Sequence, residues 1–69
     1  MNRKDYELVA QTLATRLRVA REATHGYVDG RGREVVISTV NAVAQDLAVN
    51  FAVEDTDFDR QTFMAIVNG

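Results

Sequence analysis

Apolar residues recur at helical spacing through the middle of the chain, from Arg33 to Val53. At the α-helical step of about 100° per residue, the larger ones share one face, and Ile37, Ala44 and Ala48 border it. Those on the face are Val36, Val40, Val43, Leu47 and Phe51. A helix of about 20 residues is roughly 30 Å long, which is the full width of a small domain. The pattern therefore predicts a central helix over residues 33–53, against which the rest of the chain packs.

The start of the chain carries a second helical pattern, which predicts a helix over residues 3–24. Asn2 is suited to the N-cap position, and Asp5 places negative charge in the first turn, where the helix dipole favours it. Gly26 is suited to the position just after the helix, because glycine adopts left-handed backbone conformations without strain. The apolar face, which we expect to contact the central helix, comprises Tyr6, Val9, Leu13, Leu17 and Ala20, with Ala10 at its margin.

Residues 25–33 contain three glycines and are predicted to form the loop between the two helices. An alternative is a β-hairpin, since Asp29-Gly30 is a common hairpin turn and residues 35–37 are β-branched. However, the apolar run before the turn is only Tyr27-Val28, whereas the helical period continues without a break to Phe51. The pattern favours an antiparallel two-helix hairpin.

A short third helix is predicted over residues 60–68, after an acidic turn. With Asp59 as N-cap, Phe58 and Phe63 occupy the two positions of a hydrophobic staple. We expect this helix to fold across the open end of the hairpin, so that Phe51, Phe58 and Phe63 form an aromatic cluster. The fold class is thus all-α, in a single domain over residues 1–69. Its predicted core is Tyr6, Val9, Leu13, Leu17, Val36, Val40, Val43, Leu47, Phe51, Phe58, Phe63 and Ile66.

Both long helices also carry aliphatic residues away from the predicted core face. These are Leu8, Val19, Val35, Ala42, Val49 and Val53. Isolated exposed aliphatics are common, but a chain of 69 residues has a small core and, without cysteine, no disulfide to stabilise it. We therefore interpret this second stripe as an interaction surface, with a homodimer as the preferred assembly and another protein as a further partner.

Charge is divided unevenly along the chain. Residues 1–33 hold seven basic and four acidic side chains, a balance of +3, while residues 34–69 hold one basic and six acidic, a balance of −5. The two sum to the net charge of −2. Exposed charge pairs contribute little to stability. We therefore interpret the uneven charge as favouring one orientation of packed helices, such as an antiparallel register in a dimer.

The candidate chemical motifs are incomplete. Asp55, Asp57 and Asp59 alternate as in a calcium-binding loop, but Arg60 stands at the sixth position, where glycine is required, and Ile66 at the twelfth, where glutamate is required. One histidine and no cysteine disfavour zinc. No spacing nominates a nucleophile with its base, so we predict neither catalysis nor a cofactor.

Arg31 and Arg33, on either side of Gly32, resemble an arginine hook for the DNA minor groove. Asp29 and Glu34 flank them, and the sequence pI of about 5.1 disfavours nucleic-acid binding. Nucleic-acid association through this loop and the first helix is therefore the weaker alternative. The sequence has no uninterrupted apolar run of 18 residues and no export signal, so we expect a cytoplasmic protein without a membrane span.

The two ends of the chain resemble a group of short proteins encoded by actinobacterial bacteriophages. That group combines a start of the Arg-Lys-Asp-Tyr kind, here Arg3 to Tyr6, with an end of the Phe-Asp-Arg-x-x-Phe kind, here Phe58 to Phe63. This chain departs from the pattern in having Thr56-Asp57 where an Asn-Pro type of turn is expected. The resemblance implies a setting, the cytoplasm of an infected bacterium, without implying a reaction. A minor component of the virion is a third function compatible with it.

Overall fold

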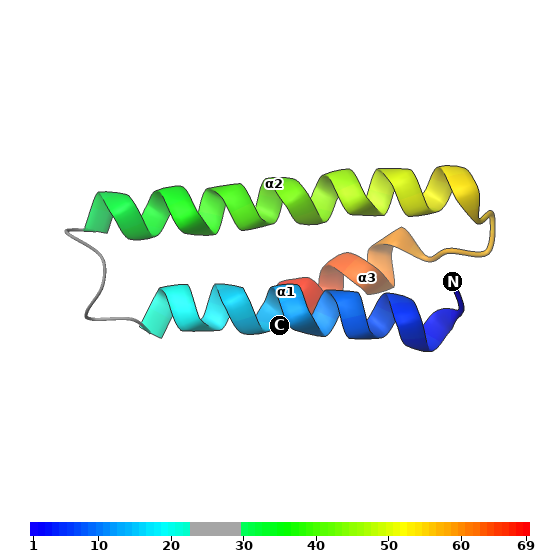
Figure 1. Cartoon of the computed structure of the whole chain (residues 1–69), viewed down its shortest axis with the longest axis horizontal. Helices are drawn as coiled ribbons and strands as arrows, with labels where there is room; N and C mark the ends of the chain where they lie inside the picture. Colours follow the sequence, from blue (N-terminus) through cyan, green and yellow to red (C-terminus); the bar gives the residue numbers. More distant parts are fainter. Residues whose placement is uncertain (23–29) are drawn as a thin grey trace.

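The structure is a computed structural model that describes residues 1–22 and 30–69, with side chains from residue 32 onward in the second range. In these residues it contains three helices, α1 (Arg3–Glu22), α2 (Gly30–Glu54) and α3 (Arg60–Val67). The two long helices lie side by side and run in opposite directions, and α3 folds back along both of them (Figure 1). The molecule is a rod with extents of 41 × 17 × 15 Å. The predicted all-α fold is confirmed.

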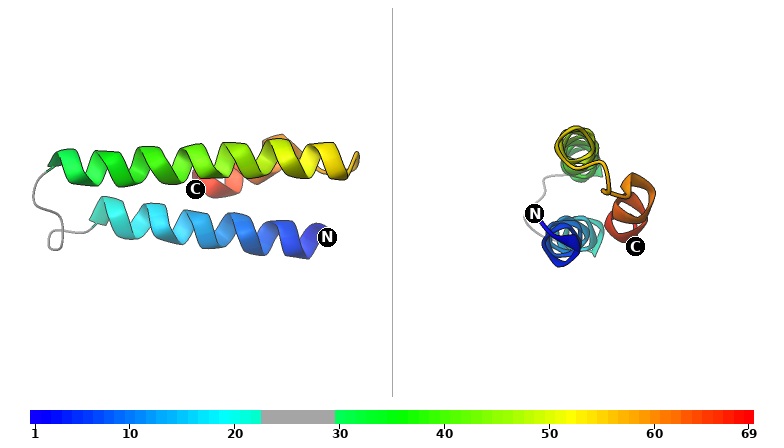
Figure 2. Two further views of the ribbon diagram at one scale, coloured as in Figure 1. Left: turned by 45° about the horizontal axis from the view of Figure 1, so that its top comes forward. Right: turned by 90° about the vertical axis from the view of Figure 1, so that its right-hand side faces the viewer.

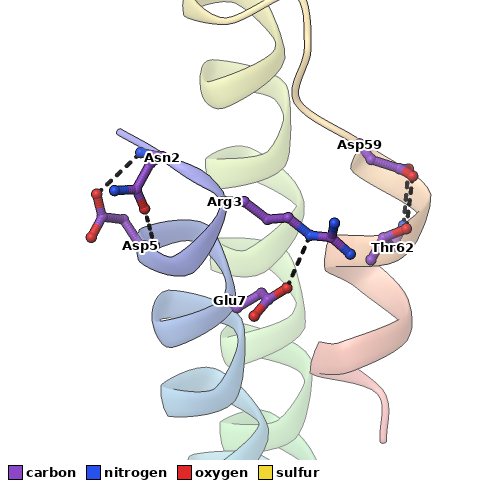
Figure 3. A network of polar contacts seen from close by, with 6 residues as sticks. All are labelled: Asn2, Arg3, Asp5, Glu7, Asp59 and Thr62. Carbon is purple, nitrogen blue, oxygen red and sulfur yellow. Dashed lines mark hydrogen bonds and ion pairs between the residues drawn. The ribbon is translucent and has the colours of Figure 1, made fainter.

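The start of α1 is capped as the sequence predicts. The backbone N–H of Asp5 donates to Asn2 Oδ1 at 3.1 Å, and the backbone N–H of Asn2 donates to Asp5 Oδ2 at 3.1 Å (Figure 3). This is a reciprocal capping box in which aspartate takes the place of the usual glutamate. The predicted end of the helix at residue 24 and the Gly26 cap lie outside the described residues.

The second helix is longer than its apolar pattern predicts. It begins at Gly30 rather than Arg33, so the prediction of a loop through residue 33 is wrong for its last residues. Extending an existing helix adds one hydrogen bond per residue fixed, which offsets the weak helix propensity of glycine. At its other end α2 continues to Glu54, one residue past the predicted end at Val53.

The third helix starts at the predicted cap. Asp59 accepts a hydrogen bond from the backbone N–H of Thr62 at 3.1 Å and another from the Thr62 hydroxyl at 2.7 Å. The helix ends at Val67, and Asn68 is its C-cap. A helix of 8 residues is too short to be stable alone, so its packing against α1 and α2 holds it in place.

The core lies where the three helices meet, and it differs from the predicted core on α2. Ala44 and Ala48, predicted at the border of the apolar face, are fully buried, while Val43 is 44% exposed. Val36 is half-buried and lies outside the core cluster. The prediction that Val43 is a core residue is wrong, because α3 covers only one flank of the hairpin and moves the buried arc toward itself. The core cluster is Ala10, Leu17, Ala44, Ala48, Phe63 and Val67.

Candidate protein-interaction surface

Four aromatic rings join the three helices at the end of the rod that carries the N-terminus. Phe58 packs against Tyr6 with ring centroids 4.7 Å apart and against Phe63 at 5.4 Å. Phe51 lies 4.9 Å from Tyr6 and 5.5 Å from Phe58. The predicted cluster of three phenylalanines is confirmed, and Tyr6 adds a fourth ring that the helical pattern had assigned only to the core. The staple contact between Phe58 and Phe63 fixes how the chain enters α3.

Polar contacts at the same end hold the turn between α2 and α3. The Tyr6 hydroxyl donates to Asp55 Oδ2 at 3.0 Å, and the backbone N–H of Asp57 donates to Asp55 Oδ1 at 2.9 Å. Burial raises the pKa of Tyr6, and the hydrogen bond to the Asp55 carboxylate raises it further. These contacts engage Asp55 in the turn, and the described residues contain no group of three or more acidic or histidine side chains that could hold a metal ion.

A groove of about 530 Å³ separates the start of α1 from α3. Figure 3 shows its polar groups, where Arg3 Nε donates to Glu7 Oε1 at 3.2 Å and Asp59 caps α3. The hydrogen bonds from Thr62 lower the pKa of Asp59, and the nearby Arg3 contributes in the same direction. Each of these contacts lies within one helix end, since Arg3 pairs with Glu7 on α1 and Asp59 caps α3.

The described arginines proposed for nucleic-acid contact do not all lie on one surface. Arg33 is half-buried on α2, and the side chain of Arg31 lies outside the described part of the chain. On α1, Arg18 and Arg21 line a groove beside the C-terminal end of α3. Arg16, two positions before Arg18, lies about 160° around the helix from it. A phosphate backbone following the Arg18 side of α1 would therefore leave Arg16 uncontacted.

The second apolar stripe is exposed on both helices, as predicted. Leu8, Val19, Val35, Ala42, Val49 and Val53 are all solvent-exposed. On each helix these residues lie opposite the core, so those of α1 and those of α2 point to different sides of the rod. On α1 the hydroxyls of Thr12 and Thr15 donate to backbone carbonyls one turn earlier. The stripe therefore forms two separate surfaces, one per helix.

A different surface spans both long helices. Viewed along the rod, α1, α2 and α3 occupy three corners, and α3 lies to one side of the hairpin (Figure 2, right). Because the helices are right-handed and antiparallel, Val9 on α1 and Val43 on α2 lie on the other side. We call this the open face. Its apolar residues, half-buried except for the exposed Val43, are Val9, Leu13, Val36, Val40, Val43 and Leu47.

The sequence assigned all of these residues to the core, and four of them do pack against the core cluster, namely Val9, Leu13, Val40 and Leu47. The sequence did not reveal that they also remain partly exposed on one common face. A signal for it was nevertheless present. Val36, Val40, Val43 and Leu47 follow one another at steps of four, three and four residues, the spacing of a helix that packs lengthwise against another helix. With α3 placed on the opposite flank, that stripe has room for one more helical layer.

The segment Gly32–Glu54 of α2 is also long and apolar enough to cross a membrane by length and composition. Counting uninterrupted apolar residues misses it, because Asn41, Asp46 and Asn50 are spaced along it. Core helices of soluble proteins satisfy the same criteria but are mostly buried, whereas only 11% of this segment's apolar window is buried. One face of the segment packs against α1 and α3.

Comparisons with models of protein families, with curated proteins and with solved structures find no match to this chain.

Proposed function

We propose that this protein is a non-enzymatic protein-interaction module that acts as a homo-oligomer. The observation that carries the proposal is that both long helices have more apolar surface than the fold buries. Val53 on α2 is 78% exposed and Leu8 on α1 is 63% exposed, in addition to the half-buried residues of the open face. Helices that are apolar on several sides are typical of proteins that pack against a partner.

The roles of the polar residues support a binding function over catalysis. Asn2, Asp5 and Asp59 cap helices, Asp55 holds a turn, and Glu7 pairs with Arg3. Each of these groups has a structural role that accounts for its position. Catalysis would require an acid or base directed at a substrate site with a nucleophile or a stabilising group within reach.

The resemblance of the chain ends to actinobacteriophage proteins suggests the setting. We place the protein in the cytoplasm of an infected bacterium, where its further partner is a host or a phage protein. The association is proposed to be with protein rather than nucleic acid, since the arginines of α1 lie on different flanks and the net charge is −2.

Two measurements test this proposal together. The molar mass in solution, determined by light scattering over a range of concentrations, should correspond to a dimer. A tagged protein should retain a specific protein from host lysate with or without nuclease treatment. A monomer at all concentrations that retains nothing would contradict the proposal. Retention lost on nuclease treatment would instead favour nucleic-acid association through Arg33 and the arginines of α1.

A further inference from the structure

We infer that the open face binds a second copy of the chain, with the two α2 helices antiparallel and crossing near Val43. The inference deepens the proposed function, on which it rests, by naming the partner and the face. In this arrangement the α1–α2 hairpins of the two copies pack face to face as a four-helix bundle, and each α3 remains on the outside. Four helices packed in this way bury the apolar flank that two helices leave half-exposed.

The residues of α2 on the open face have the spacing that lets a second helix pack along the whole length of α2. A strip of α2 residues repeats at intervals of seven positions. It consists of Arg33, Val40, Leu47 and Glu54, with Val36 and Val43 between them. A seven-residue repeat keeps these side chains on one strip of the helix facing a neighbouring helix. Val9 and Leu13 of α1 border the strip on the same side of the hairpin. The strip is half-buried in one copy, so a second copy can complete its burial.

The charges at the two ends of this strip favour a second copy of the chain as the partner, with its α2 helix antiparallel to the first. The strip begins with the cation of Arg33 and ends with the anion of Glu54, and Val43 lies midway between them. A two-fold axis near Val43 places Arg33 of each copy beside Glu54 of the other and Val40 beside Leu47. A parallel pair would instead place like charges together, which is unfavourable. On α1 the same flank repeats this polarity, with Asp5 toward the acidic end and Arg16 toward the basic end.

The second apolar stripe is less suited to forming a dimer than the open face is. Its residues on α1 and on α2 point to different sides of the rod, so a partner covering one set would leave the other in water. On α2 it runs through Val35, Ala42 and Val49 and ends at Val53, an aliphatic residue, rather than at an acid. A copy docked there would contact a single helix rather than two.

The first experiment compares Val43→Glu with Val49→Glu. The two valines lie on the same helix and are 44% and 43% exposed, but only Val43 lies on the open face. Sedimentation equilibrium should show that Val43→Glu weakens the dimer by about 100-fold or more, because it buries an unpaired carboxylate in the interface. Val49→Glu should change the dissociation constant by no more than about threefold. Circular dichroism checks that both variants retain their helices.

The outcomes separate this inference from the proposed function. Dissociation by Val49→Glu with a dimer retained in Val43→Glu would overturn the open face while leaving a homo-oligomer in place. A parent protein that is monomeric at every concentration would overturn both. Equal effects of the two variants would also contradict a dimer centred on Val43.

The second experiment tests the antiparallel direction by exchanging charges. Arg33→Glu and Glu54→Arg should each weaken the dimer, and the double variant should restore it to within about threefold of the parent. Both changes suit the dipole of α2, since glutamate near the start and arginine near the end of a helix are favourable, so neither should unfold the chain. Additive weakening in the double variant would exclude the antiparallel pairing.

Discussion

The hydroxyl of Tyr6 donates a hydrogen bond to Oδ2 of Asp55 at 3.0 Å, joining the first turns of α1 to the residue that follows α2. The same tyrosine ring packs against Phe51 and Phe58, which flank that turn. Residues 49 positions apart in the sequence are thereby fixed together at one end of the hairpin. The contact places the start of α3 against both long helices, and the position of α3 decides which flank of the hairpin stays open.

Replacing Tyr6 with phenylalanine should lower Tm by a few degrees, because the ring remains while Asp55 loses its donor. The effect should depend on pH. The pKa of Tyr6 is raised above its usual value of about 10, so its contribution is present below pH 10 and is lost as the pH rises through the higher folded value. Thermal melts from pH 8 to 11 should therefore converge for parent and variant at the alkaline end. A constant gap across that range would contradict this account.

Replacing Asp59 with alanine should lower Tm by about 4–8 °C, the shift expected from losing a helix cap in a domain of this size. The folded pKa of Asp59 is lowered from its usual value of 3.8 by the hydrogen bonds from Thr62. Its contribution is therefore present above pH 4 and is lost as the pH falls through the folded value. Asp59→Asn, which keeps a capping oxygen, should stay closer to the parent at pH 7 and vary less in acid. Equal melts for the alanine and asparagine variants would exclude the cap as the cause.

Truncating Leu17 to alanine should cost about 2–5 kcal/mol of unfolding free energy, because this side chain is 0% exposed where the three helices meet. Leu8→Ala on the same helix removes the same atoms from a side chain that is 63% exposed. It should change the unfolding free energy by no more than about 0.5 kcal/mol. Urea denaturation of the two variants provides the comparison, and similar midpoints would show that the buried face of α1 is misassigned.

Enlarging Ala44 to leucine should destabilise the fold by about 1–3 kcal/mol, because its methyl group is fully buried between helices. The matched change Ala42→Leu, two residues earlier on the exposed side of α2, should be close to neutral. Urea denaturation measures both. Tolerance of leucine at residue 44 would mean that the helices are farther apart than the fully buried alanines indicate.

The protein should remain in the aqueous fraction when mixed with lipid vesicles, although Gly32–Glu54 has the length of a membrane span. Asp46 lies within that segment, and a carboxylate near the centre of a bilayer costs about 2.5–3.5 kcal/mol on insertion scales. Flotation with neutral vesicles, before and after thermal unfolding, measures this directly. Flotation of the folded protein would favour a membrane role over the proposed interaction module.

The sequence by itself determined the features that depend on neighbouring residues. The Asn2 cap, the Asp59 cap and the staple between Phe58 and Phe63 all lie within five positions along the chain, where side-chain chemistry and helix geometry decide the contacts. The three helices follow from the same local periodicity. The early start of α2 at Gly30 escaped prediction, because glycine propensity is a weak local signal that helix extension overrides.

Only the tertiary structure decided which flank of each helix is buried. Val43 and Ala44 are adjacent in sequence and about 100° apart around α2, within the apolar arc that periodicity defines. The sequence pattern assigned Val43 to the core because larger aliphatic residues are expected to be buried. In the structure α3 packs on the flank of Ala44, where a small side chain lets helices approach closely. The separation of the core from the open face is therefore a consequence of where α3 docks, which no short-range pattern in the sequence specifies.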